Sequence, residues 1–293
     1  MKRISYSFLA IFIFSLLSAC NPEERIPAYV QIESIDLQTG LGQGSTSADF
    51  KYARLFSGIE DLGQFFLPAQ IPILKEGTHQ IDIFPGINDN GISATPVPYA
   101  LLKPISVDVD LQAGMVTPLS VTASYKDNLE FVFIEEFESE NQVFREELDN
   151  DPITSVNLTS DIVFEGSRSA ILLVDDEHPT LMVGSSIIEE LPLPGVPVYL
   201  ELNYQTEETF EVGISWLSTS GGRETSFQNA VTAKSEWGKI YINFTTLLEI
   251  LNTVQGLEAW QIVLRLRMPV EDGQIVIGER KTYLDNFKLI YVK

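Results

Sequence analysis

The stretch Trp260–Met268, WQIVLRLRM, decides the fold class of this chain. Apolar side chains stand at positions 262, 264, 266 and 268, and Arg265 and Arg267 lie between them. Successive side chains on a β-strand point to opposite faces, so a period of two predicts a strand with one face in a core and one face outside it. The stretch therefore predicts β-structure near the C-terminus.

The rest of the second half repeats this pattern. Further predicted strands are 131–137, 170–174, 181–187, 198–205, 209–217, 224–230, 239–244, 273–278 and 283–292. Residues 138–151 are rich in carboxylates and predict a long loop, and Thr245–Leu251 predicts one or two helical turns. About ten strands with one short helix predict a two-sheet jelly roll over residues 130–293, rather than a seven-stranded immunoglobulin-type domain.

The first half predicts a second β-unit. Its candidate strands are 29–37, 50–56, 78–84, 105–111 and 116–125, and turn residues separate them. Pro68 and Pro72 predict an edge strand or an extended connection, because proline cannot donate a ladder hydrogen bond. We therefore expect an all-β chain of two units, in which an immunoglobulin-like β-sandwich over residues 28–126 precedes the jelly roll.

Net charge excludes two classes of partner. The chain has 41 acidic and 19 basic residues, a formal net charge of −22. Such a surface repels nucleic acid and anionic lipid headgroups. The stretch Asp127–Glu177 is dense in carboxylates, with Arg145 and Arg168 as its basic residues. This density is typical of a solvated face, and it is also compatible with a divalent cation.

The N-terminus has the layout of a secretory signal. Lys2 and Arg3 precede an apolar run from Phe8 to Leu17, and small residues follow before Cys20, the one cysteine of the chain. The run is about ten residues long, well short of the roughly twenty that a helix needs to cross a membrane. We expect residues 1–19 to be removed as a signal peptide, which takes the net charge to −24.

Leu17-Ser18-Ala19-Cys20 resembles the lipobox of bacterial lipoproteins. The resemblance implies that the Cys20 thiol is diacylated, that the chain is cut just before it, and that residues 20–27 form a lipidated tether. Asn21 stands where the family's inner-membrane retention signal has Asp, which implies the outer membrane, with the surface and the periplasmic side both open. The alternative is an ordinary secretory cleavage site with a chance cysteine.

Four phrases of the second half resemble carbohydrate-binding modules of the galactose-binding-like jelly-roll type. They are EFE at 136–138, FEGSRS at 164–169, WGKIYI at 237–242 and YLDNF at 283–287. The first half resembles the immunoglobulin-like or PEGA-like domains that precede such modules in surface lipoproteins. The phrases that carry this are 67–72 and 85–87.

The resemblance to these modules implies a structural Ca²⁺ that joins the first strand to the last. Its ligands would come from Glu138, Ser169 and Asp285, since Ca²⁺ takes six to eight oxygen ligands. The alternative is that Glu138 is a solvated loop carboxylate and that Asp285 pairs with Arg265 or Arg267 on a neighbouring strand.

Sugar-binding jelly rolls stack pyranose rings on exposed aromatic side chains. The candidates for such a platform are Tyr204, Trp216 and Trp260, with Trp237 as a further one. The alternative for each is a place in the core, where most aromatic side chains lie. Trp216 continues the apolar face of its strand, which favours the core for that residue.

No catalytic constellation is visible in the sequence. His79 and His178 are the only histidines, and they fall in different halves and in no metal-binding motif. Glu135 and Glu136 are adjacent, so on a strand they point to opposite faces and cannot form a glycosidase pair. We therefore expect a lipid-anchored, non-enzymatic surface protein that binds an extracellular glycan. The alternative is a structural subunit that binds another envelope protein through a sandwich face or a strand edge.

Overall fold

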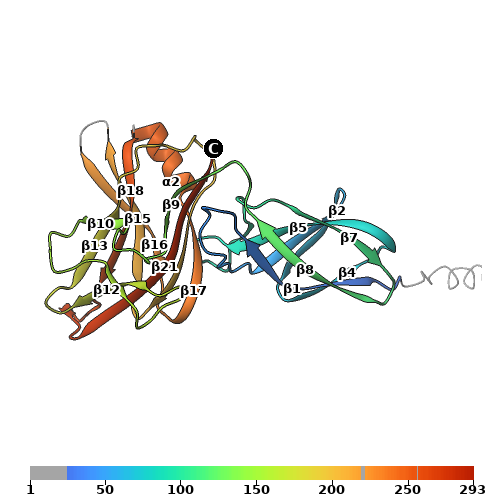
Figure 1. The fold of residues 1–293 in the computed structure, drawn as a ribbon, viewed down its shortest axis with the longest axis horizontal. Coiled ribbons are helices and arrows are strands. Elements are labelled where there is room, and N and C mark those ends of the chain that lie inside the picture. The colour runs from blue at the N-terminus through green and yellow to red at the C-terminus, as the bar shows by residue number, and fades with distance from the viewer. Residues whose placement is uncertain (1–24, 219–221, 256) are drawn as a thin grey trace, which may run out of the picture.

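The computed structural model describes residues 25–218, 222–255 and 257–293 and confirms the all-β prediction. Figure 1 shows two lobes, a smaller one built from the first half of the chain and a larger one built from the second. The predicted signal segment, Cys20 and the first residue of the Gly221-Gly222 turn lie outside the described residues. In the described part, no helix is long and apolar enough to cross a membrane.

The smaller lobe is a sandwich of two sheets. Its strands are β1 (Ala28–Gln38), β2 (Tyr52–Ser57), β3 (Glu60–Phe66), β4 (Ala69–Ile73), β5 (Gly77–Asn88), β6 (Pro96–Pro98), β7 (Ile105–Leu111) and β8 (Val116–Ser124). One sheet has the order β4-β1-β8, in which β1 and β8 run parallel. The other has the order β3-β2-β5-β6, and β7 also pairs with β5. The proline-flanked segment is β4, an edge strand as expected.

Alternation in these strands builds the first core. Val30 and Ile32 of β1 and Ile81 and Ile83 of β5 are fully buried between the sheets. The strand predicted over 78–84 is too short, because β5 covers Gly77–Asn88. β5 continues through Pro85 to Asn88, because β2 and β6 pair with this second part of the strand.

The larger lobe is a two-sheet jelly roll. Its strands are β9 (Leu129–Glu135), β10 (Phe144–Glu147), β11 (Asn157–Thr159), β12 (Ser169–Asp175), β13 (Thr180–Ser185), β14 (Val198–Thr206), β15 (Phe210–Ser218), β16 (Arg223–Val231), β17 (Lys234–Asn243), β18 (Leu257–Arg267), β19 (Val270–Glu271), β20 (Gln274–Ile275) and β21 (Glu279–Val292). One sheet has the order β10-β13-β18-β15-β16. The other has the order β11-β12-β21-β14-β17, with β9 also on β21.

The stretch that indicated the fold forms most of β18, in the middle of its sheet. Ile262, Leu264 and Leu266 are fully buried in the jelly-roll core, and Arg265 and Arg267 point the other way, to Glu211. The predicted short helix is α2 (Thr245–Ile250), which continues as a π-helical turn, Leu251–Gln255. The predicted acidic loop contains the short strand β10, which the sequence analysis missed.

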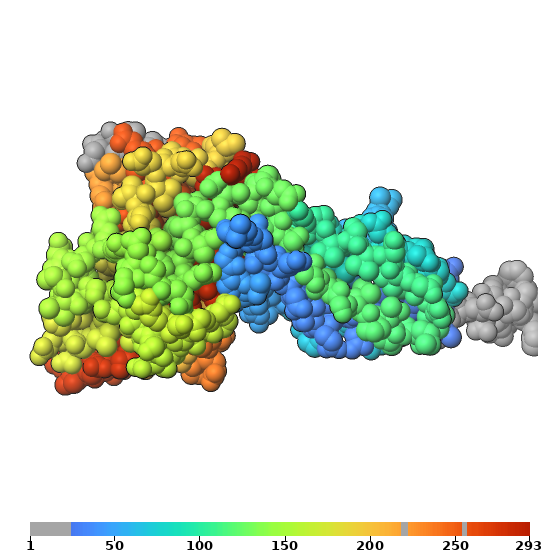
Figure 2. Space-filling view, viewed as in Figure 1, coloured from blue at the N-terminus to red at the C-terminus, as the bar shows by residue number. Residues whose placement is uncertain are grey.

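The two lobes share a buried junction. Residues 39–51, which connect β1 and β2, lie against the jelly-roll sheet that contains β14, β17 and β21, and Figure 2 shows the blue atoms of this region pressed against the larger lobe. Tyr199, Tyr241 and Ile290 of the jelly roll belong to the same apolar cluster as the core of the smaller lobe. The first unit therefore covers part of one outer face of the second.

Candidate functional site

The outer face of the β12-β21-β14-β17 sheet carries the polar residues that lead to the candidate site. In β14, the buried residues Val198, Leu200 and Leu202 point into the jelly-roll core. The intervening positions 199, 201, 203 and 205 are Tyr, Glu, Asn and Gln and point outward. Along this row the face divides into a part covered by the smaller lobe, a part crossed by a loop, and an open part.

Glu201 is the centre of the covered part. Its Oε1 accepts hydrogen bonds from Tyr99 Oη and Tyr125 Oη, each at 2.7 Å, and both tyrosines belong to the first half of the chain. Its Oε2 lies 3.3 Å from Lys239 Nζ. The Glu201 and Lys239 side chains are 1% and 2% exposed. A carboxylate this deeply buried is tolerated only where donors and a cation satisfy it.

A second ammonium group completes the charge cluster. Lys288 is fully buried, and its Nζ donates to the backbone carbonyl of Ser45 and, at 3.3 Å, to Tyr125 Oη. Burial lowers the pKa of Lys288 to about 8, and Glu201 opposes that shift. Burial also acts to raise the pKa of Glu201, but the two ammonium groups of Lys239 and Lys288 and the two tyrosine hydrogen bonds together outweigh it and lower that pKa. The smaller lobe is therefore tied to the sheet by hydrogen bonds to buried charged groups, from Tyr99 and Tyr125 to Glu201 and from Lys288 to Ser45.

Asn243 continues this junction at the outer edge of the sheet. Its backbone N–H donates to Asn90 Oδ1 at 2.8 Å, and its amide donates to Asp89 Oδ2 at 3.2 Å and to Tyr199 Oη at 3.0 Å. Tyr241 Oη accepts the backbone N–H of Asp49 at 2.9 Å. This end of the face is therefore filled by the other lobe.

The loop between β11 and β12 crosses the middle of the face. Ser169 begins β12, and its Oγ donates to the Ile162 carbonyl at 2.5 Å. From there the loop reaches across to Trp237 on β17, whose ring centroid lies 5.5 Å from that of Phe164. β21 and β14 lie between β12 and β17 in this sheet. We call residues 162–168 the strap.

Asp285 of β21 holds the strap from below. It is fully buried and accepts the backbone N–H of Glu165 at 3.2 Å and that of Asn286 at 2.8 Å. The pKa of Asp285 is raised to about 7. Burial is the main cause, the neighbouring Glu165 carboxylate adds to it, and the hydrogen bonds from backbone N–H groups act against it. Glu165 in turn accepts from Asn286 Nδ2 at 3.0 Å and from Ser45 Oγ.

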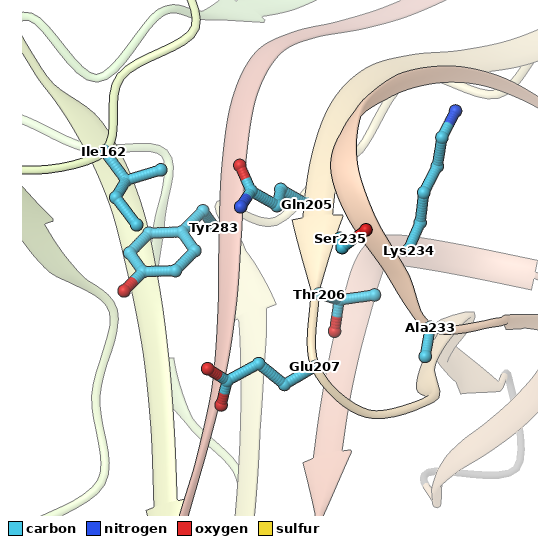
Figure 3. Close-up of a pocket in the computed structure, with 8 residues that line it drawn as sticks. All are labelled: Ile162, Gln205, Thr206, Glu207, Ala233, Lys234, Ser235 and Tyr283. Atoms are coloured by element: carbon cyan, nitrogen blue, oxygen red, sulfur yellow. The ribbon is translucent and has the colours of Figure 1, made fainter.

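Beyond the strap, the face is open and forms a cavity of about 380 Å³. Its lining comes from the strap, from the ends of β14 and β21, and from the turn into β17: Ile162, Gln205, Thr206, Glu207, Ala233, Lys234, Ser235 and Tyr283. Figure 3 shows the Tyr283 ring, the Gln205 amide and the Glu207 carboxylate turned toward a common space. Of these, Glu207 Oε2 already accepts the Lys281 backbone N–H at 3.1 Å.

This set of groups suits a neutral polyhydroxylated ligand. An amide, a carboxylate and a hydroxyl offer donors and acceptors of both kinds, and Figure 3 shows the Lys234 ammonium group turned away from them. The Tyr283 ring adds an apolar surface beside them, and pockets of this mixed character orient small ligands through a few polar groups. We call this set of lining residues the strap pocket.

The three residues expected to bind Ca²⁺ meet at the strap but face different parts of it. Glu138 Oε1 accepts the backbone N–H groups of Ser167 and Arg168 at 2.7 and 3.0 Å, which lowers its pKa. Ser169 and Asp285 bond to other strap residues, as described above. Oxygens that receive N–H donors already face positive charge, so this arrangement does not fit a cation as it stands. Within the described residues, no group of three or more His, Cys, Asp or Glu is placed to hold a metal ion.

The alternative partner for Asp285 is corrected as well. Arg265 and Arg267 lie on the opposite sheet and pair with Glu211, at 2.7 and 3.0 Å. Glu138 is exposed as the alternative expected, and it also fixes the strap turn. The calcium ion itself stays a prediction.

The aromatic candidates occupy three different environments. Trp260 is 0% exposed and Trp216 is 6% exposed, and both indoles belong to the jelly-roll core, which corrects their place in the candidate ligand site. Tyr204 is half-buried, and its ring packs on Phe210, with ring centroids 5.9 Å apart. Trp237 lies on the outer face against the strap rather than in the core, since it stacks with Phe164.

Sequence reasoning missed the residues that line the strap pocket. Tyr283 was recognised only as part of a closing strand, and Gln205 and Glu207 were not recognised at all. The sequence pattern of β14 could have indicated this face, because its alternation puts only polar or tyrosine side chains on one side of the strand. An outer face that is continuously polar but flanked by aromatic residues on neighbouring strands could have been identified as a binding face.

The two histidines stay apart from this site. His178 Nδ1 lies 2.7 Å from Asp151 Oδ2, which raises the pKa of the imidazole, and this pair joins the loop after β10 to the turn between β12 and β13. His79 Nε2 lies 3.0 Å from the Glu76 carbonyl in the smaller lobe. Neither contact brings a histidine to the strap pocket.

Comparisons with known proteins identify similar solved structures but no family. No protein-family model matches the chain, and no curated protein matches it. A CBM22 xylan-binding domain from Paenibacillus barcinonensis is 12% identical, over 56% of this chain and 96% of that domain, with a TM-score of 0.39. A family 30 carbohydrate-binding module from Clostridium thermocellum is 13% identical over 54% of this chain and 96% of that one, with a TM-score of 0.39. A carbohydrate-binding module of the β-sandwich superfamily is 15% identical over 92% of this chain and 99% of its own, again with a TM-score of 0.39.

Proposed function

We propose that this protein is a non-enzymatic, lipid-anchored receptor that binds an extracellular glycan in the strap pocket. The observation that carries the proposal is the meeting of the Tyr283 ring with the Gln205 amide and the Glu207 carboxylate around one open cavity of about 380 Å³. That volume lies in the range of roughly 300–1,000 Å³ in which proteins bind small ligands.

A sugar suits this pocket for physical reasons. The C–H face of a pyranose ring packs on an aromatic ring, and its hydroxyls both donate and accept hydrogen bonds. An anionic ligand suits it less, because the Glu207 carboxylate faces the pocket and the protein as a whole carries −22. The resemblance of residues 136–287 to carbohydrate-binding modules supports the same ligand class.

A glycan array tests the proposal on residues 21–293, which include every described residue. We expect binding to at least one glycan, and we expect Tyr283→Ala to weaken it about two- to twelvefold, since stacking on an aromatic ring contributes roughly 0.5–1.5 kcal/mol. The matched control is Tyr29→Ala, on the half-exposed face of β1 in the smaller lobe. Equal binding by both variants would contradict the proposal, and so would the absence of binding to every glycan on the array.

The lipid anchor and the cellular location are part of the proposal. We infer that Cys20 is diacylated and holds the protein on an outer membrane, because two acyl chains give stable attachment. The test is a Cys20→Ser variant in the native host, which should leave the membrane fraction and fail to incorporate labelled palmitate. Protease treatment of intact cells then separates the surface side from the periplasmic side. Retention of the variant in membranes would contradict lipid anchoring.

A second candidate function rests on a different part of the jelly roll. β9 pairs with β21 alone among the described strands, so its other edge is open. A cavity of about 550 Å³ lies beside it, and its lining combines apolar residues with Glu130, Glu189 and Glu190. Ile187, in the same lining, is 47% exposed. An open edge beside apolar and acidic side chains suits an extended basic segment of another envelope protein.

Two synthetic hexapeptides separate this candidate from the first. An alternating Lys-Val peptide should bind, and its Glu-Val counterpart should not, because the carboxylates repel it. Ile187→Lys should abolish the binding and leave glycan binding unchanged. Equal binding of the two peptides would rule out recognition by charge at this edge.

A further inference from the structure

The strap pocket has one closed end, and this feature bears on which part of a glycan it accepts. Gln205 and Glu207 lie at the end of β14 that is farthest from the smaller lobe. The next outward residue toward the lobe is Asn203, which is 2% exposed. The face therefore passes from open to fully covered within two residues along the strand.

The strap makes this closure. The strap begins on the β12 side of the sheet, and its Phe164 ring contacts Trp237 on β17. It therefore crosses both central strands, β21 and β14. Its backbone is fixed to β21 by the hydrogen bond from Glu165 N–H to Asp285, and its other end by the hydrogen bonds to Glu138. The strap is thus held at three places and closes the pocket as a wall.

The smaller lobe stands directly behind this wall. Ser45 contacts both Glu165 of the strap and Lys288 of the sheet. Behind Ser45 lie Glu201 and its tyrosine partners, which are inaccessible to solvent. A ligand that entered the pocket along the strands would meet the strap and then a second, packed lobe.

We propose that the strap pocket binds the ends of glycan chains or short oligosaccharides, and that it excludes the interior of a polysaccharide. This inference rests on the proposed function. A chain interior needs a groove that is open at both ends, whereas a terminal unit needs only one opening. A cavity of about 380 Å³ is near the lower limit for small-ligand pockets, which fits about one or two sugar rings.

The number of chain ends per gram of a polysaccharide can be varied without changing its sugar composition. Each of several soluble polysaccharides, including xylan, laminarin and mixed-linkage glucan, is compared with the oligosaccharides that partial acid hydrolysis makes from it. Titration calorimetry on residues 21–293 gives the binding capacity per gram of sugar. Hydrolysis that raises the number of ends tenfold should raise this capacity about tenfold, because each end is one ligand.

Two variants connect the result to the pocket. Tyr283→Ala should weaken the binding of the oligosaccharides by the same factor as on the glycan array. Phe164→Ala, at a side chain that is 39% exposed, should leave the fold intact, loosen the closed end and lower the preference for ends over interiors at least threefold. Unchanged unfolding midpoints show that the strap variant is folded.

The outcomes separate the two proposals. A capacity that hydrolysis does not change means that chain interiors bind, which overturns the inference and leaves the glycan receptor standing. A capacity that follows the ends and keeps its affinity in Tyr283→Ala places the end-binding site elsewhere and overturns the assignment to the strap pocket. Silence toward every polysaccharide and every oligosaccharide overturns both proposals.

Discussion

The two ends of one sheet face differ in what covers them. At one end, Glu201 and Lys239 are buried under the smaller lobe, and Glu201 pairs with Lys239 and accepts hydrogen bonds from two tyrosine hydroxyls of that lobe. At the other end, Gln205 and Tyr283 stand on the same strands and face an open cavity. Both ends present polar side chains at alternate positions, so the strand pattern alone does not distinguish them. The first end already has its partner within the chain, and the second has none among the described residues.

The difference distinguishes polar side chains that stabilise the fold from polar side chains that are available to bind a ligand. A buried carboxylate must be satisfied by the protein itself, since leaving it unpaired costs several kcal/mol. A half-exposed amide at a cavity can be satisfied by water until a ligand replaces it. Substitutions at the covered end should therefore affect folding, and substitutions at the open end should affect binding.

The largest effect is expected for Glu201→Ala. The change leaves the buried Lys239 ammonium without its carboxylate and two tyrosine hydroxyls without their acceptor, so we expect a loss of about 3–5 kcal/mol in unfolding free energy. Denaturant unfolding monitored by tryptophan fluorescence measures it. Glu211→Ala is the matched control, because Glu211 also pairs with two basic residues but at a partly exposed site, and it should cost about 1 kcal/mol or less. Equal costs would show that the covered end is not a specially stabilised junction.

Two glycines of the segment 39–51 test the packing of the junction. Gly44 and Gly42 have φ angles of +66° and +76°, so alanine is strained at both. A Cβ at Gly44 would lie 2.9 Å from Ile134 Cγ2 and 3.2 Å from Lys288 Cε, whereas a Cβ at Gly42 would meet nothing within 4 Å. We expect Gly44→Ala to cost about 1–3 kcal/mol more than Gly42→Ala in unfolding free energy. Identical unfolding midpoints would mean that the segment does not pack on the sheet as described.

The sequence predicted the strands better than it predicted what lies on them. Alternation predicted β18 and its two faces, because one face packs in a core and the other meets polar surroundings. It could not show that positions 201, 239 and 288 are buried as well, since their cover includes residues 76 to 243 positions away in the chain. Long-range contacts of this kind leave no periodic signal.

Long-range contacts also decide where the predicted site residues lie. Trp216 and Trp260 are paired neighbours on β15 and β18 and fill the core together, which their apolar strand faces favoured. Glu138, Ser169 and Asp285 were grouped by the resemblance, and all three do meet the strap, but as acceptors or donors that fix a loop. Tyr283 could be placed in a cavity only once the strap and the β16–β17 turn were seen beside it.

Asp285 gives a pH-dependent effect at the boundary between the two ends. Its pKa is raised to about 7 in the folded protein, against about 3.9 for an unperturbed Asp. The folded state therefore keeps this proton to higher pH than the unfolded chain, and the stability that it contributes is present below about pH 4 and is lost as pH rises to about 7. Asp285→Asn should remove this decline, which is at most about 1.4 kcal/mol per pH unit.

The measurement is unfolding free energy against pH between about 4 and 7. The same change at Asp36, an exposed residue of β1, is the control and should leave the slope as it is in the unaltered protein. A decline that persists in Asp285→Asn would mean that another group titrates in this window.

Calcium should give the smallest effect, and it tests whether the strap is fixed by the protein alone. Glu138 and Asp285 already accept backbone N–H groups of the strap, so a cation would have to displace those donors. We expect 1 mM calcium to change the unfolding free energy by less than about 0.5 kcal/mol. A rise of about 2 kcal/mol or more that Glu138→Gln abolishes would show that the strap rearranges to bind the ion. In that case the wall of the pocket would be a metal-dependent element, and glycan binding should then depend on calcium too.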